Sequence, residues 1–260
     1  MGGTVRIERD ARGVATLWLA RAEKHNALSA EMLGEITEAA AGLGADPTVR
    51  VVVLAAEGPS FCAGGDLGWM RAQMAADAET RGREARKLAL MLKALDEIPK
   101  PLIGRVQGNA FGGGVGLLSV CDVAVGADTL RMGLTEVRLG LIPATIGPYV
   151  VARMGAAMAR RVFFSARLFG AEEAVRLGLL AKAVPQDELD AAVEAQVAPY
   201  LSCAPGAVAE AKALVRRLGP VADEAVIDMT VAALVRCWEG DEAEEGIAAF
   251  FDKRAARWAG

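Results

Sequence analysis

The chain is poor in the side chains that carry most metal and acid–base chemistry. Its 260 residues contain one histidine, His25, and four cysteines without C-x-x-C spacing or a histidine cluster. The cysteines are Cys62, Cys121, Cys203 and Cys237. Such scattered thiols predict a reduced protein of the cytoplasm, without a metal site. No G-x-S-x-G sequence occurs, so nothing local supports a hydrolase triad, and pairing of Cys62 with His25 would depend entirely on the tertiary fold.

Long apolar runs and an excess of positive charge are also missing. No uninterrupted apolar run approaches the ~18 residues of a membrane span, and the N-terminal sequence MGGTVRIERD lacks the apolar core of a signal peptide. We therefore expect no membrane partner. The net charge of −4 offers no general basic field and argues against a nucleic-acid partner. What the chain has is an apolar share of 53%, enough for a large core in one domain or a domain with an appendage.

A glycine-rich turn at Gly112–Gly114 is the most informative local feature. It lies between a predicted strand, Leu102–Val106, and a predicted short helix, Val115–Val120. Glycine allows close approach of a ligand, and the first turn of a helix presents unpaired N–H groups. Such a turn suits a phosphate or the oxyanion of a polarised carbonyl. Neither nucleotide-binding spacing, G-x-G-x-x-G/A or G-x-x-x-x-G-K-[ST], is matched, which leaves the oxyanion or a tight turn without a ligand.

A second loop with small residues follows another predicted strand. This loop, Ser60–Met70, reads SFCAGGDLGWM and comes after Val49–Ala55. The backbone of Ala63, Gly64 and Gly65 could face a substrate because their side chains are small. Two such loops after two strands could supply two N–H donors to one carbonyl oxygen.

The order of the remaining predicted elements indicates an α/β fold with a helical C-terminal part. Further strands are predicted at Val5–Arg9, Val14–Leu19, Val123–Val125 and Leu130–Met132. Helices are predicted from Ser29, as N-cap, to about Leu43 and at Ala76–Ile98, Ala156–Phe164, Ala171–Leu177, Asp187–Leu201, Pro205–Leu218, Val221–Trp238 and Asp241–Ala256.

Three segments in consistent order resemble a known family. F-C-A-G-G-D-L, A-F-G-G-G-V-G-L and T-E-V-R-L-G-L-I-P are similar to the crotonase (enoyl-CoA hydratase/isomerase) superfamily, over roughly Val14 to Val184. The sequences of these segments most resemble those of bacterial methylglutaconyl-CoA hydratases. The resemblance implies a spiral of ββα units in residues 1–200, which would hold the coenzyme A and oxyanion sites. It also implies a helical region at 201–260 that makes trimer contacts and covers the active site, and thus a homotrimer or a dimer of trimers. Coenzyme A would enter as part of the acyl-CoA substrate, with no separate cofactor.

The resemblance assigns catalytic roles to three residues. The two backbone N–H donors of the oxyanion site would belong to Ala63 and Gly113, and Glu136 would be the catalytic carboxylate. The second glutamate of two-glutamate hydratases is missing, because Gly116 stands in its place. An alternative interpretation is that Glu136 is an acidic residue that stabilises the start of a helix.

The same resemblance implies binding residues around the substrate. Lys24 is expected to contact the phosphates or adenine end of coenzyme A, although a solvated lysine before a helix is an equal alternative. Gly64 and Gly65 would face the substrate, and Trp69 would form a wall of the acyl pocket or simply belong to the core. Asp66 is expected to fix the loop or contact the coenzyme, with a replacement acid as the lesser alternative.

One carboxylate leaves two reactions open. Glu136 could activate water and return its proton to carbon 2, as a hydratase, or move a proton between carbons, as a Δ3-Δ2 isomerase. The resemblance favours a hydratase, acting on a substrate such as 3-methylglutaconyl-CoA in leucine breakdown. The second carboxylate of that substrate would need a partner such as Lys24, Arg71 or Arg138. A non-catalytic acyl-CoA- or RNA-binding protein is the alternative of another class.

Overall fold

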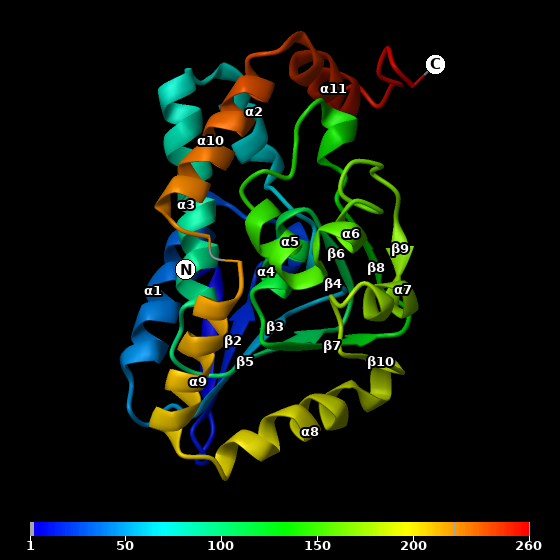
Figure 1. Cartoon of the computed structure of the whole chain (residues 1–260). Helices are drawn as coiled ribbons and strands as arrows, with labels where there is room; N and C mark the ends of the chain where they lie inside the picture. The colour runs from blue at the N-terminus through cyan, green and yellow to red at the C-terminus, as the bar shows by residue number, and fades with distance from the viewer. Residues whose placement is uncertain (1–2, 221, 260) are drawn as a thin grey trace.

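The computed structural model describes residues 3–220 and 222–259 (Figure 1). The chain begins with an antiparallel pair, β1 (Val5–Arg9) and β2 (Val14–Leu19), with the predicted bounds. The predicted start of one C-terminal helix, Val221, lies outside the described residues. Within the described ranges, no helix combines the length and apolar character needed to cross a bilayer.

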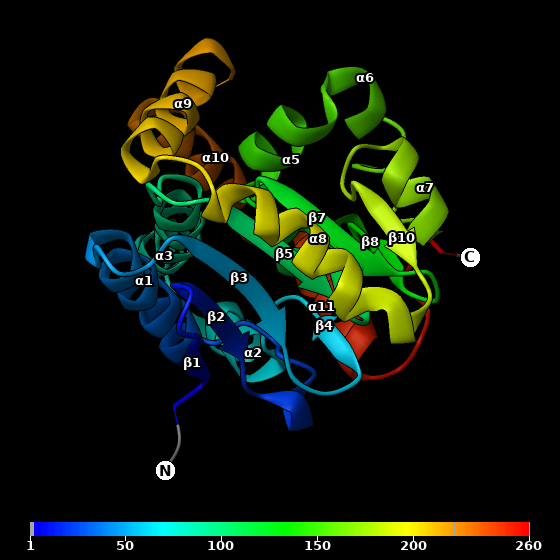
Figure 2. The same cartoon turned by 90° about the horizontal axis from the view of Figure 1, so that it is seen from below.

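A six-stranded sheet forms the larger layer. From β2 onward its strands are parallel, in the order β1-β2-β3-β5-β7-β10. The added strands are β3 (Val51–Ala56), β5 (Leu102–Val106), β7 (Val123–Ala127) and β10 (Lys182–Val184). Figure 2 shows α8 (Leu189–Leu201) crossing one face of this sheet.

The central strand β3 is buried on both faces, which explains its unbroken apolar sequence. Val51, Val53 and Ala55 pack with the α8 residues, whereas Val52, Leu54 and Ala56 join the main core on the other face. Successive side chains of a strand point to opposite faces, so both faces need apolar residues here.

A second, four-stranded sheet has the order β4-β6-β8-β9. Its strands are β4 (Ser60–Cys62), β6 (Asn109–Phe111), β8 (Arg131–Gly133) and β9 (Phe169–Gly170). The strands β3, β5 and β7 of the large sheet are each followed in the chain by one strand of the small sheet, and helices come next. These repeats confirm the predicted α/β spiral of ββα units. The sequence pattern did not reveal β4, β6, β9 or β10, none of which has more than three residues, although β8 is equally short and was predicted at Leu130–Met132.

The first helices agree with the sequence in part. α1 (Ala30–Ala45) starts after Ser29, whose hydroxyl accepts a hydrogen bond from the Met32 N–H, so the predicted N-cap is confirmed. The helix predicted at Ala76–Ile98 is present as α3 (Ala78–Asp96), which starts two residues later because Asp77 is its N-cap. The preceding helix, α2 (Leu67–Ala75), was not predicted. The glycine turn opens α4 (Gly113–Ser119).

The C-terminal half is mostly helical, as predicted. After α5 (Gly147–Met154), which the pattern did not reveal, the helix expected at Ala156–Phe164 stops at Ala159. The remaining helices are α6 (Ala156–Ala159), α7 (Ala171–Arg176), α9 (Pro205–Leu218), α10 (Glu224–Trp238) and α11 (Asp241–Phe251), with short 3-10 turns η1 (Ala22–Lys24), η2 (Glu136–Leu139) and η3 (Gln186–Glu188). α10 packs on α3, and α11 lies on η2 (Figure 1).

Candidate active site

The site consists of three segments, each of which follows one of three parallel strands of the small sheet. β4 leads into Ala63–Gly65, β6 leads into Gly112 and Gly113, and β8 leads into Glu136 on η2. These strands are neighbours in the order β4-β6-β8. Because the carboxyl ends of parallel strands lie along one edge of a sheet, segments far apart in the sequence meet there.

The two glycine-rich loops pack backbone against backbone. A Cβ atom at Gly64 would lie 3.3 Å from the carbonyl oxygen of Phe111, and a Cβ at Gly114 would lie 2.6 Å from that of Cys62. Gly64 also has a φ of +95°, which side chains disfavour. These positions therefore require glycine, and their absent side chains bring the loops of β4 and β6 into contact.

A methyl group at Gly114 is expected to separate the loops. In Gly114→Ala the new Cβ would meet the backbone of β4, which cannot rotate away, so we expect a loss of about 1–3 kcal/mol in unfolding free energy. A displacement near 1 Å in the site can also cost about 10²-fold in rate. Thermal unfolding and enoyl-CoA turnover measure the two effects.

The matched control is Gly34→Ala on α1. A Cβ at Gly34 meets no atom of the described part of the chain within 4 Å, and alanine favours a helix over glycine by about 1 kcal/mol. This variant should be at least as stable as the wild type and fully active. Equal behaviour of the two variants would contradict the close packing at Gly114.

The available N–H donors differ from the prediction at one position. The Ala63 N–H already donates to the carbonyl oxygen of His25, at 3.0 Å, so it is not free for a ligand. This corrects the predicted role of Ala63. Gly65 forms a parallel bridge with Leu28. In this bridge the Leu28 N–H donates to the carbonyl oxygen of Gly64, and the Asp66 N–H donates to the carbonyl oxygen of Leu28. The N–H of Gly65 therefore points away from Leu28, and it has no acceptor among the described residues.

Gly113 supplies the second free donor. It is the first residue of α4, where an N–H has no partner within the helix, and no acceptor for it lies in residues 3–220 or 222–259. Gly65 and Gly113 both line one cavity with Glu136. Sequence reasoning included Gly65 only as a backbone that faces the substrate, because the direction of its N–H depends on pairing with Leu28.

Glu136 has an unusual environment for a carboxylate. Its Oε2 is enclosed and has no hydrogen-bond partner among the described residues. Burial raises its pKa to about 7, and the opposing hydrogen bond from its own N–H is the weaker influence. Oε1 lies against Gly112, 2.9 Å from where a Cβ would be at that position. A carboxyl group with a pKa near neutrality can both accept and return a proton.

The cavity around Glu136 has a volume of about 240 Å³. Its walls are mainly apolar and include Leu28, Met70, Leu141, Ile146, Leu234 and Trp238. Trp69 lines it, and its role as a wall of the acyl pocket stays a prediction. The indole Nε1 of Trp69 is enclosed and lacks a partner among the described residues. Leu234 and Trp238 come from α10 and Phe250 from α11, so the C-terminal helices cover the site. The sequence offered no signal for these three residues.

A larger hollow, of about 560 Å³, lies between α5 and α9. Tyr149, Arg153 and Lys212 are among its lining residues, but it contains no part of the two glycine loops and no residue of η2. The chemistry therefore points to the smaller cavity, where the free N–H groups and the buried carboxyl group are found together.

Asp66 fixes the first loop and does not line the cavity. Its carboxylate caps α2 by accepting from the N–H groups of Gly68 and Trp69, and it forms an ion pair with Arg21 at 3.1 Å. Burial would raise the pKa of Asp66, but the hydrogen bonds from Trp69 and Arg21 hold it below its ordinary value. The loop-fixing interpretation agrees with these contacts, whereas a replacement acid does not.

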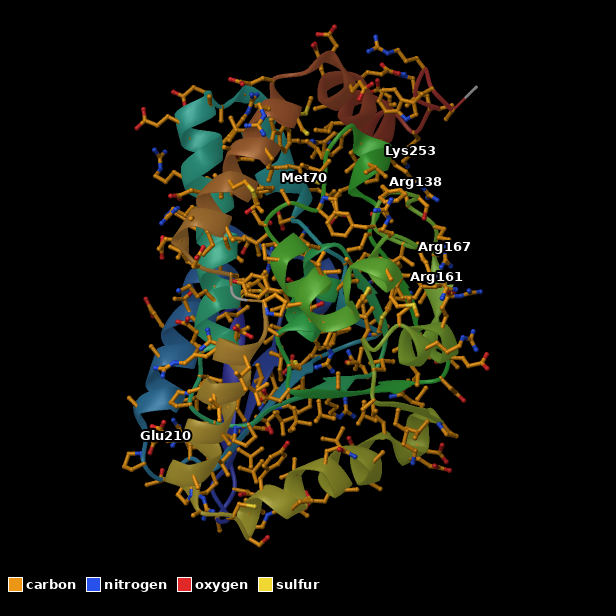
Figure 3. The ribbon with its side chains drawn as sticks, viewed as in Figure 1. Met70, Arg138, Arg161, Arg167, Glu210 and Lys253 are labelled. Atoms are coloured by element: carbon orange, nitrogen blue, oxygen red, sulfur yellow. The ribbon has the colours of Figure 1, made fainter. Side chains whose placement is uncertain are left out.

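The other predicted residues lie outside the cavity lining. Lys24 is exposed on η1, which leaves its contact with coenzyme A a prediction. His25 Nδ1 lies 3.0 Å from the Ser60 hydroxyl, whereas Cys62 is buried and burial raises the pKa of its thiol to about 12. No His25–Cys62 pair is therefore formed. Arg138, labelled in Figure 3, is exposed, and the guanidinium of Arg71 lies over the Phe251 ring at 4.4 Å.

The position of the missing glutamate is filled by apolar atoms. A Cβ at Gly116 would lie 2.6 Å from Cγ2 and 3.0 Å from Cβ of Ile146, and 3.5 Å from Leu92. No side chain fits at residue 116 unless Ile146 moves. The packing of α4 against the start of α5 therefore leaves no room for a glutamate at residue 116.

Comparisons with known proteins agree with this geometry. The sequence profile described as enoyl-CoA hydratase/isomerase matches residues 9–260. The chain is 31% identical to the crotonyl-CoA hydratase of Syntrophomonas wolfei, covering 97% of this chain and 96% of that protein. It is 32% identical to the mitochondrial methylglutaconyl-CoA hydratase of Rattus norvegicus, covering 98% and 82%. The crystal structure of an enoyl-CoA hydratase from Mycobacterium avium is similar with a TM-score of 0.86, at 30% identity over 99% of this chain and all of that one.

Proposed function

Because the chain belongs to the enoyl-CoA hydratase/isomerase family, we propose that it adds water to the 2,3 double bond of a short 2-enoyl-CoA, with Glu136 as its only acid–base residue. The observation that carries this proposal is the meeting of two free N–H groups and one buried carboxyl group in a single cavity. The two N–H groups can polarise a thioester carbonyl, and the carboxyl group can move a proton.

The proposed reaction uses one proton twice. Ionised Glu136 removes a proton from water while the water oxygen bonds to carbon 3. The electrons of the double bond move toward the thioester, whose oxygen is stabilised by the N–H groups of Gly65 and Gly113. Protonated Glu136 then gives the same proton to carbon 2, which completes a syn addition and restores the carboxylate.

The cavity supports a short, neutral acyl group. Its 240 Å³ lies below the ~300–1,000 Å³ typical of pockets for drug-sized ligands. None of the described residues that line it is a lysine or arginine, and Lys24, Arg71 and Arg138 are not among them. A buried carboxylate is stabilised best by a cationic partner, so 3-methylglutaconyl-CoA is less well supported than a neutral enoyl-CoA. Assembly into a homotrimer or a dimer of trimers remains a prediction.

The test is product identification with three substrates: crotonyl-CoA, 3-methylglutaconyl-CoA and a 3-enoyl-CoA. We expect a water adduct from crotonyl-CoA and a kcat/KM at least about tenfold lower for the dicarboxylate, since an unpaired buried charge costs well over 1.4 kcal/mol. A shifted double bond without added water would make the protein a Δ3-Δ2 isomerase. Binding of all three without turnover would favour a non-catalytic acyl-CoA-binding protein.

A further inference from the structure

A hydratase with one carboxylate must still hold its water molecule, and Thr145 is a polar side chain in the cavity that could do so. Thr145 is 5% exposed, and it is one of the residues that line the cavity with Glu136 and Gly113. Its hydroxyl has no hydrogen-bond partner among the described residues, yet it is not one of the fully enclosed polar atoms. The hydroxyl is therefore open to the cavity.

The position of Thr145 in the chain is as informative as its exposure. The next residue, Ile146, occupies the space into which a side chain at Gly116 would project. A side chain at 116 and Ile146 thus compete for the same space. Ile146 fills the missing volume, and the residue before it, Thr145, is a lining residue of the cavity with a hydrogen-bonding side chain.

We propose that the Thr145 hydroxyl binds the attacking water molecule and orients it toward carbon 3, in a chain that has no second glutamate for this task. This inference rests on the proposed hydration. A hydroxyl can accept one hydrogen bond from water and donate one to its oxygen, but it cannot take a proton at neutral pH. Glu136 therefore remains the only proton carrier, and Thr145 fixes the oxygen while Glu136 removes a proton.

The division of labour can be tested with two reactions. Hydration of crotonyl-CoA needs the bound water and the proton carrier. Exchange of the α-protons of butyryl-CoA with D₂O needs only Glu136 and the oxyanion donors, because no water oxygen bonds to carbon. In Thr145→Val, which keeps the shape but removes the hydroxyl, we expect kcat for hydration to fall about 10- to 100-fold, the effect of one lost hydrogen bond in a site. α-Proton exchange should stay at the wild-type rate.

Two further variants make the result specific. Thr145→Ser retains a hydroxyl and should keep most of the hydration rate. Thr230→Val removes a threonine hydroxyl that donates to Ile227 within α10, and both reactions should be unchanged. Hydration by Thr145→Val at the wild-type rate, or an equal loss of hydration and exchange, would overturn the role of Thr145. Failure of the wild type itself to hydrate would instead overturn the proposed function.

Discussion

Glu136→Gln should lower the rate of enoyl-CoA hydration by about 10²–10⁴-fold, the usual contribution of one acid–base residue. Glutamine keeps the shape of the side chain but cannot accept a proton at neutral pH. Because the burial of Glu136 raises its pKa to about 7, kcat/KM of the wild type should rise with pH and level off above about pH 7. The ionised form of Glu136 is the base that removes a proton from water, so activity is lost as the pH falls through about 7.

A surface substitution provides the control for this result. Glu172 is on α7 with its side chain 89% exposed, and its one ionic partner within residues 3–220 and 222–259 is Arg176, one turn later. Glu172→Gln should hydrate crotonyl-CoA at the wild-type rate with the same pH profile. An active Glu136→Gln variant would contradict the assignment of Glu136, and a profile without a change near neutrality would contradict its raised pKa.

Glu136→Gln should also make the protein more stable than the wild type at alkaline pH. The folded pKa of Glu136, about 7, lies above its unfolded value of 4.5, so the folded state holds a proton that the unfolded state releases between these values. Wild-type stability therefore falls as the pH rises from about 4.5 to 7. At ~1.4 kcal/mol for each pH unit, the loss reaches at most about 3.5 kcal/mol. Glutamine carries no charge to bury and avoids this loss.

Thermal unfolding at pH 8 and at pH 5 can measure this difference at equal protein concentrations. At pH 8 the midpoint of Glu136→Gln should exceed that of the wild type by several degrees, and the gap should narrow at pH 5. Glu172→Gln should follow the wild type at both values. A gap independent of pH would contradict the titration of Glu136 as its cause. Lower activity with greater stability is expected when a charge is buried for function.

Much of the fold could be read from local patterns. The strands Val5–Arg9, Val14–Leu19 and Leu102–Val106 agree with the structure residue for residue, and so does the helix Pro205–Leu218. Each has a strong apolar pattern or clear end signals, and such signals are local. The strands β4 and β6 were not revealed. Three residues carry little pattern, and pairing across the small sheet stabilises these strands.

The sequence by itself determined the α/β class, the two glycine loops, Glu136 and the absence of a glutamate at residue 116. These are statements about residue type, order and spacing. Only the tertiary structure decided that the N–H of Gly65, rather than that of Ala63, is free, because a peptide N–H points toward or away from its neighbour according to strand pairing. It also decided that Ile146 fills the space beside Gly116 and that Thr145 opens into the cavity. Both depend on how α4 meets α5, a contact between segments that no local pattern records.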